Sequence, residues 1–183
     1  REVVWNEYKV LSGMPAMGLS IDLSKYFTTE ELNALWSCQN LQHYLVRTAT
    51  TLSSEPALIA SELLLNLINT TDAAIEGKNA NINLRFGHAE TLMPLLSLMR
   101  LRGCYYMTNY FDTVALHWKD FDIVPMGANL QMVLFKTDKG DYCVRFDLNE
   151  RPVPLLPNSD EIYTPWQQAR EYLVHCLPLH LQP

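Results

Sequence analysis

Apolar residues recur at helical spacing through two stretches in the first 78 residues of the chain. Thr28 and Glu31 have the spacing of a capping box, so the apolar residues that follow predict a helix over Thr29–Arg47. A second helix is predicted over residues 56–76, because proline suits its first turn and a glycine follows its end. Residues 1–27 mix turn formers with short apolar groups, and we expect a loop or a ligand cover there.

From residue 81 the apolar positions alternate with polar ones, which is typical of strands. Residues 81–86 predict a strand that ends at Gly87 and leads into an apolar helix over residues 91–101. Leu130–Lys136 and Tyr142–Leu148 predict a hairpin around a turn at residues 138–141. The remaining expectations are a packed connection over 104–129 with a short helix near 113–118, an edge segment at Pro152 and Pro154, and a last helix from Thr164 to about His175.

This order, helices first and then strands with flanking helices, indicates an α/β fold with a mixed sheet. The 183 residues suit one domain or two small subdomains packed together. We expect a helical subdomain over residues 1–78 and a sheet-containing part over residues 79–183.

Composition and charge narrow the possible functions. The chain is 48% hydrophobic and 19% charged, as in globular proteins, and no apolar run approaches the roughly 18 to 20 residues of a membrane span. Its net charge of -6 argues against nucleic acid as the main partner, although a local group of donors can still bind a small anion. The chain begins at Arg1 without a signal-like start, so we expect a fragment or a processed product.

The cysteines leave two alternatives open. No Cys-x-x-Cys pair is present, which disfavours a zinc knuckle or a dithiol redox motif. In an exported protein the four residues allow three pairings into two disulfides; otherwise they are half-buried free thiols. They are Cys38, Cys104, Cys143 and Cys176.

The strongest chemical candidates are His88 and Glu90, which stand where the predicted strand passes into a helix. Free backbone N–H groups and the helix dipole favour an anion at such a place. His88 can hold a phosphate oxygen there, and Glu90 can donate a proton to a leaving alkoxide, because a bound phosphate repels the ionised carboxylate. The simpler interpretation is a helix start at which Glu90 offsets the dipole.

Other polar residues and another chemistry compete with this interpretation. His-Ala-Glu is also the zinc-deaminase signature, but it then needs a downstream Pro-Cys-x-x-Cys, which is absent, so we expect neither a metal nor another cofactor. Arg85 is either a substrate contact at the rim of the site or a solvated or salt-bridged arginine. His43 and Arg47, one helical turn apart, line either a polyanion groove or a solvent-facing stripe.

The sequence around His88 resembles a known family. Residues 84–98 read Leu-Arg-Phe-Gly-His-Ala-Glu-Thr-Leu-Met-Pro-Leu-Leu-Ser-Leu. Together with residues 124–130 and 144–155, they closely resemble the multiple inositol polyphosphate phosphatases, the His-Ala-Glu branch of the histidine acid phosphatases and phytases. The resemblance implies a histidine-phosphatase-like fold, in which residues 1–78 belong to a helical cap and residues 79–183 form the C-terminal half of the catalytic core.

The resemblance also implies hydrolysis of a small anionic phosphate ester, such as an inositol phosphate, through a phosphohistidine. His88 would contact the phosphate and Glu90 would donate the proton. The family's nucleophile stands in an Arg-His-Gly-x-Arg-x-Pro motif, and none of the five histidines here follows an arginine or precedes a glycine. We therefore expect this chain alone to be inactive, with a non-catalytic phosphate- or partner-binding module as the alternative.

Two further expectations concern the surroundings of the protein. Family habit favours the periplasm, the secretory route or the cell exterior. A partial core leaves apolar surface uncovered, which favours a homodimer.

Overall fold

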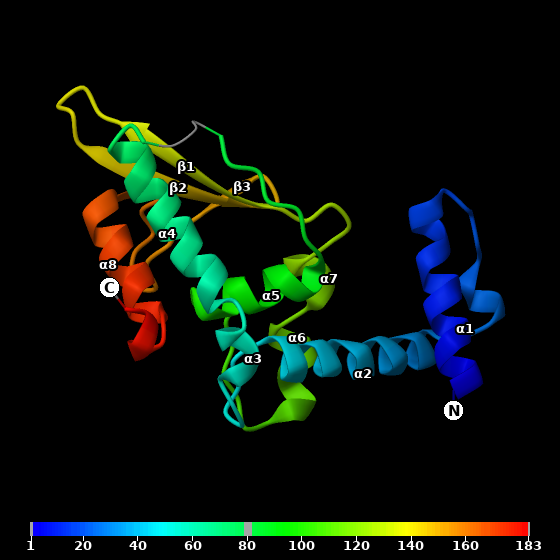
Figure 1. Cartoon of the computed structure of the whole chain (residues 1–183). Coiled ribbons are helices and arrows are strands. Elements are labelled where there is room, and N and C mark those ends of the chain that lie inside the picture. Colours follow the sequence, from blue (N-terminus) through cyan, green and yellow to red (C-terminus); the bar gives the residue numbers. More distant parts are fainter. Residues whose placement is uncertain (1, 79–81, 183) are drawn as a thin grey trace.

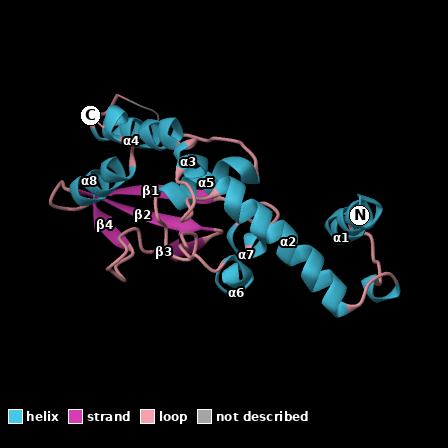
Figure 2. Cartoon of the chain, turned by 90° about the horizontal axis from the view of Figure 1, so that it is seen from below, coloured by secondary structure: helices cyan, strands magenta, loops and turns pink. Residues whose placement is uncertain are grey.

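The computed structural model describes residues 2–78 and 82–182. Helices α4, α5 and α8 lie on the same side of a four-stranded sheet in Figure 1. Figure 2 shows the strands from below, with α2 leading away from them toward α1. The α/β class predicted from the order of elements is confirmed.

Helix α1 (Glu2–Gly13) occupies the segment in which a loop was predicted. Tyr8 and Leu11 on α1 are buried against Phe27 in a small cluster of their own. This cluster stands apart from the sheet and is connected to it through α2 (Figure 1). The prediction for residues 1–27 was wrong because the turn formers begin only at Gly13, after which two short 3-10 helices follow, η1 (Met14–Met17) and η2 (Leu23–Lys25).

Helix α2 (Thr29–Arg47) confirms its prediction, including both hydrogen bonds of the capping box. The second predicted helix is divided into α3 (Glu55–Leu58) and α4 (Ser61–Ile75). At the break, the Ser61 hydroxyl donates to the carbonyl of Leu58 at 2.6 Å. A side chain that binds a nearby carbonyl competes with the backbone hydrogen bonds of a helix. The apolar spacing is therefore continuous over residues 56–76, although the helix is interrupted before Ser61.

Residues 82–88 form no strand, although their alternation predicted one; Asn81 lies outside the described residues. Ile82, Leu84 and Phe86 are exposed, Phe86 to 93%. Extended backbone becomes a strand only when a neighbour supplies hydrogen bonds, and no strand of the described ranges pairs with this segment. It leads directly into α5 (Ala89–Leu98), which begins two residues before its predicted start and buries its second half.

The hairpin of β1 (Leu130–Lys136) and β2 (Tyr142–Leu148) confirms its prediction. Its register runs from Leu130 opposite Leu148 to Lys136 opposite Tyr142. Strands β3 (Arg151–Val153) and β4 (Tyr163–Pro165) both pair with the other edge of β2. The sheet predicted as mixed is antiparallel in every pairing between described strands, because residues 82–86 do not join it.

The connection before β1 contains η3 (Phe111–Thr113) and α6 (Val114–His117), where a short helix was predicted. It also contains α7 (Asp120–Ile123), which was not predicted. The last long helix, α8 (Trp166–Cys176), begins two residues after its predicted start at Thr164. Thr164 belongs to β4 instead, where it pairs with Val144. A final 3-10 turn, η4 (Leu179–Leu181), follows.

One large hydrophobic core joins the helices to the sheet. It includes Tyr44 and Leu64 from the first 78 residues, Leu96 from α5, and Phe146 from β2. Each of these four side chains is at most 1% exposed. The main core thus draws on both sides of residue 78, and the division of the chain at that residue stays a prediction.

Candidate functional site

His88 and Glu90 both stand at the start of α5, two positions apart in the sequence. His88 is the N-cap residue, with extended backbone at φ −114° and ψ 170°. Its carbonyl accepts hydrogen bonds from the N–H groups of Thr91 at 2.9 Å and Leu92 at 3.2 Å, which begins the helix. The His88 side chain makes no capping hydrogen bond, so the imidazole remains available to a ligand.

The surroundings of this pair are open. All residues from 82 to 90 are exposed, and Glu90 lies in the first turn of α5, where backbone N–H groups lack helical partners. Pro94 lies inside the same helix and has no N–H to give to the Glu90 carbonyl. The helix start is therefore polar and accessible, while its other end is anchored in the core.

Arg85 is held against α4. Its Nε and Nη2 atoms donate to Oδ1 of Asn66 at 3.2 and 2.7 Å, and Nη2 also donates to Oγ1 of Thr70 at 3.1 Å. Arg85 therefore has polar partners on a helix while remaining exposed, and its two predicted roles, a substrate contact or a solvated or salt-bridged residue, stay open. His88, Glu90 and Arg85 all lie on the same short stretch of chain.

His43 does not join this group. Its Nδ1 lies 2.8 Å from Oδ2 of Asp120, and Trp36 Nε1 donates to Oδ1 of the same carboxylate at 3.1 Å. The alternatives predicted for His43, a polyanion groove or a solvent-facing stripe, are corrected to a hydrogen bond with a largely buried carboxylate. Burial acts to raise the pKa of Asp120, but the hydrogen bonds from His43, Trp36 and the Phe121 N–H prevail and hold it below its usual range.

Sequence reasoning missed the polar contacts that hold His43 on α2 and Arg85 against α4. Asp120 and His43 are 77 positions apart, and Arg85 and Asn66 are 19 apart. Asparagine on a helix and aspartate in a connection are common surface residues, so no local pattern distinguished them. Only the packing of the helices brings these side chains to their partners.

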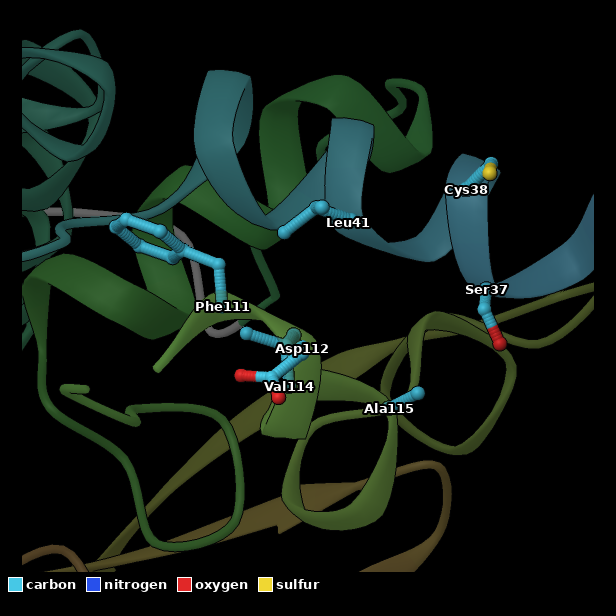
Figure 3. A pocket seen from close by; sticks show the side chains of 7 residues that line it. All are labelled: Ser37, Cys38, Leu41, Phe111, Asp112, Val114 and Ala115. Carbon is cyan, nitrogen blue, oxygen red and sulfur yellow. The ribbon is translucent and has the colours of Figure 1, made fainter. Parts of the chain in front are cut away.

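Two cavities lie away from this site. One of about 170 Å³ lies between α2 and the segment around α6, as Figure 3 shows. Its lining consists of Ser37, Cys38, Leu41, Phe111, Asp112, Val114 and Ala115. A second of about 390 Å³ lies between α1 and α2. Neither cavity is lined by His88, Glu90 or Arg85, which lie at the exposed helix start.

The cysteines and the remaining ligand candidates can be placed as well. All four cysteines are free, and burial raises the pKa of the Cys104 thiol to about 12. Within residues 2–78 and 82–182, no three His, Cys, Asp or Glu side chains are grouped so that they could hold a metal ion. Over the same part of the chain, no helix is long and apolar enough to cross a membrane.

Comparisons with known proteins agree with the family resemblance of the sequence around His88. The family described as "Histidine phosphatase superfamily (branch 2)" matches residues 17–149. Multiple inositol polyphosphate phosphatase 1 from Gallus gallus is 30% identical over 129 residues, which cover 66% of this chain and 29% of that protein. The protein of the same name from Homo sapiens is 32% identical over 114 residues, covering 55% and 23%.

A third protein of that name, from Dictyostelium discoideum, is 34% identical over 95 residues, covering 48% of this chain and 14% of its own length. The chain thus spans less than a third of the length of each of these relatives.

Proposed function

Because the chain belongs to the histidine phosphatase superfamily (branch 2), we propose that it provides the phosphate-binding and proton-donating part of an inositol phosphate phosphatase. The observation that carries the proposal is the exposed start of α5, where His88 and Glu90 stand beside helical N–H groups without partners. The names of the relatives support the substrate class. An anion at this position is stabilised by those N–H groups and by the helix dipole.

The proposed reaction has two steps. A nucleophilic histidine nitrogen attacks phosphorus while the ester oxygen leaves and takes a proton from Glu90, and a phosphohistidine forms. Water then attacks phosphorus, Glu90 takes a proton from that water, and the bond from phosphorus to nitrogen breaks to release phosphate. His88 contacts phosphate oxygens throughout. The nucleophile must come from outside these 183 residues, because none of the five histidines stands in an Arg-His-Gly segment.

Arg85 is proposed as an auxiliary phosphate contact. Two of its guanidinium nitrogens are used by α4, which leaves the Nη1 edge for an oxyanion. Arginine suits this role because its planar fork matches phosphate oxygens and stays charged. We also propose that the protein acts in an exported or lumenal compartment, on the resemblance alone. A homodimer through uncovered apolar surface is proposed as well, supported by the exposed apolar side chains of residues 82–86.

The second candidate is a phosphate-binding module without catalysis, which the missing nucleophile favours. A direct experiment separates this possibility from a complete enzyme. The purified chain is titrated with inositol hexakisphosphate while histidine ring signals are followed by NMR, and phosphate release is measured at acidic pH. We expect a shift of the His88 signal, its loss in His88→Gln but not in His175→Gln, and no turnover. Steady phosphate release by the chain alone would contradict the assignment of the nucleophile.

The proton-donor role of Glu90 is tested in a longer polypeptide that contains an Arg-His-Gly segment. Glu90→Gln should slow hydrolysis of alkyl phosphates far more than that of nitrophenyl phosphate, because nitrophenolate leaves without protonation. A loss of the same size on both substrates would argue against an acid role.

A further inference from the structure

We propose that Asn66 of α4 is a positioning residue for the phosphate site at the start of α5. It acts on the segment of residues 82–88, called the strap below, which enters α5 and carries Arg85 and His88. The inference rests on the proposed function, since it concerns how that phosphate site is arranged. Neither the family match nor the sequence pattern pointed to Asn66.

The contact between α4 and the strap is specific in its geometry. One amide oxygen, Oδ1 of Asn66, accepts from both Nε and Nη2 of Arg85 at 3.2 and 2.7 Å. Thr70 follows Asn66 by one helical turn and accepts from the same Nη2 at 3.1 Å. The Thr70 hydroxyl itself donates to backbone carbonyls of α4 at 2.8 and 3.1 Å.

The contact with α4 matters because the described strands do not hold the strap. It pairs with no strand of the described ranges, and its alternating apolar side chains are exposed. Three hydrogen bonds from a charged donor group are stronger than the same number between neutral groups. Arg85 precedes His88 by three residues, at most roughly 10 Å of extended chain, so holding Arg85 also restricts where the imidazole can lie.

The chemical identity of the acceptor matters as much as its position. Asn66 and Thr70 are neutral, so they orient the guanidinium without cancelling its charge. An aspartate at position 66 would hold Arg85 at least as firmly but would neutralise it and place a carboxylate near the anion. A neutral acceptor therefore suits an arginine whose remaining edge is directed to phosphate, whereas a purely structural tie would function equally well with a carboxylate.

The experiment separates the position of the acceptor from its lack of charge. Asn66→Ala removes the acceptor, and Asn66→Asp keeps it and adds a negative charge. Asn69, which is exposed on the same helix, supplies the matched controls Asn69→Ala and Asn69→Asp. Order of the strap is read from backbone ¹⁵N relaxation of residues 84–88, which reports picosecond to nanosecond motion. Affinity is read from the His88 ring signal during titration with inositol hexakisphosphate.

We expect Asn66→Ala to lower the order of the strap and Asn66→Asp to preserve it, with both Asn69 variants unchanged. Both Asn66 variants should weaken binding by roughly three- to tenfold, the effect of about one ordinary hydrogen bond, because Asn66 acts on the anion only through Arg85. Equal relaxation in Asn66→Ala and Asn69→Ala overturns the inference, as does an affinity in Asn66→Asp no lower than that in Asn69→Asp. If the unaltered chain shows no ligand-induced shift of His88, the proposed function fails, while relaxation alone still decides whether Asn66 holds the strap.

Discussion

Replacing Asp120 by alanine should destabilise the protein far more than a surface aspartate would. The Asp120 carboxylate accepts hydrogen bonds from Trp36 Nε1 at 3.1 Å, from His43 Nδ1 at 2.8 Å and from the N–H of Phe121 at 2.8 Å. Its side chain is 11% exposed, so water cannot replace the carboxylate freely. These contacts join α2 to the connection that leads into β1.

The size of the effect follows from those three bonds. A hydrogen bond to a charged group contributes about 1.5–3 kcal/mol, and a buried donor left without a partner adds a desolvation cost. The bonds share one carboxylate and are not additive, and His43 at 31% exposure can regain water. We therefore expect Asp120→Ala to lower the free energy of unfolding by about 2–4 kcal/mol. The control Asp122→Ala, exposed on the same short helix, should stay within about 0.5 kcal/mol.

Urea unfolding of both variants from pH 7 to pH 3, followed by fluorescence and circular dichroism, measures the effect. The pKa of Asp120 is lowered in the folded protein, so its charge contributes stability that is fully present above the unfolded value of 3.8. That part is lost as pH falls through the folded pKa. The difference between the variants should thus be constant near neutrality and shrink in strong acid.

Two outcomes would refute this reasoning. The first is a loss in Asp120→Ala no larger than that in Asp122→Ala. The second is a difference between the two variants that grows in strong acid, where Asp120 becomes protonated. A double-mutant cycle with His43→Ala isolates the ion pair, and a coupling energy near zero would show that the Trp36 and backbone bonds act alone.

Two other predictions concern the contact between α4 and α8 and the burial of the cysteines. Asp72→Ala should lower the free energy of unfolding in urea by about 1–2 kcal/mol, because the Asp72 carboxylate accepts hydrogen bonds from the Trp166 indole and from Arg170 Nε, each at 2.8 Å. A loss no larger than that of an exposed-site change such as Glu62→Ala would contradict this prediction. In thiol labelling at pH 8, exposed Cys38 should react in the folded protein. The thiol of Cys104 in the main core, whose pKa burial raises to about 12, should react only on unfolding. Rapid native labelling of Cys104 would refute its burial.

Much of the fold could be predicted from the sequence because those elements depend on local chemistry. The capping box of Thr28 and Glu31 fixed the start of α2, and period-two alternation with a short turn fixed the hairpin of β1 and β2. His88 and Glu90 were predicted as site residues on the same local basis, since a motif of three residues at a helix start is local, and their roles stay a prediction. The helix break at Ser61 was missed because apolar spacing does not report a hydroxyl that binds a nearby carbonyl.

What depends on distant neighbours was decided only by the tertiary structure. Alternation in residues 82–86 specifies extended backbone, but a strand needs hydrogen bonds from another strand, and sequence alone cannot supply that partner. The contacts of Asp120 with His43 and of Asn66 with Arg85 exist because helices pack at particular angles and distances. The sequence by itself thus determined which residues carry the candidate chemistry, and the packing of α4 decided how the arginine beside them is held.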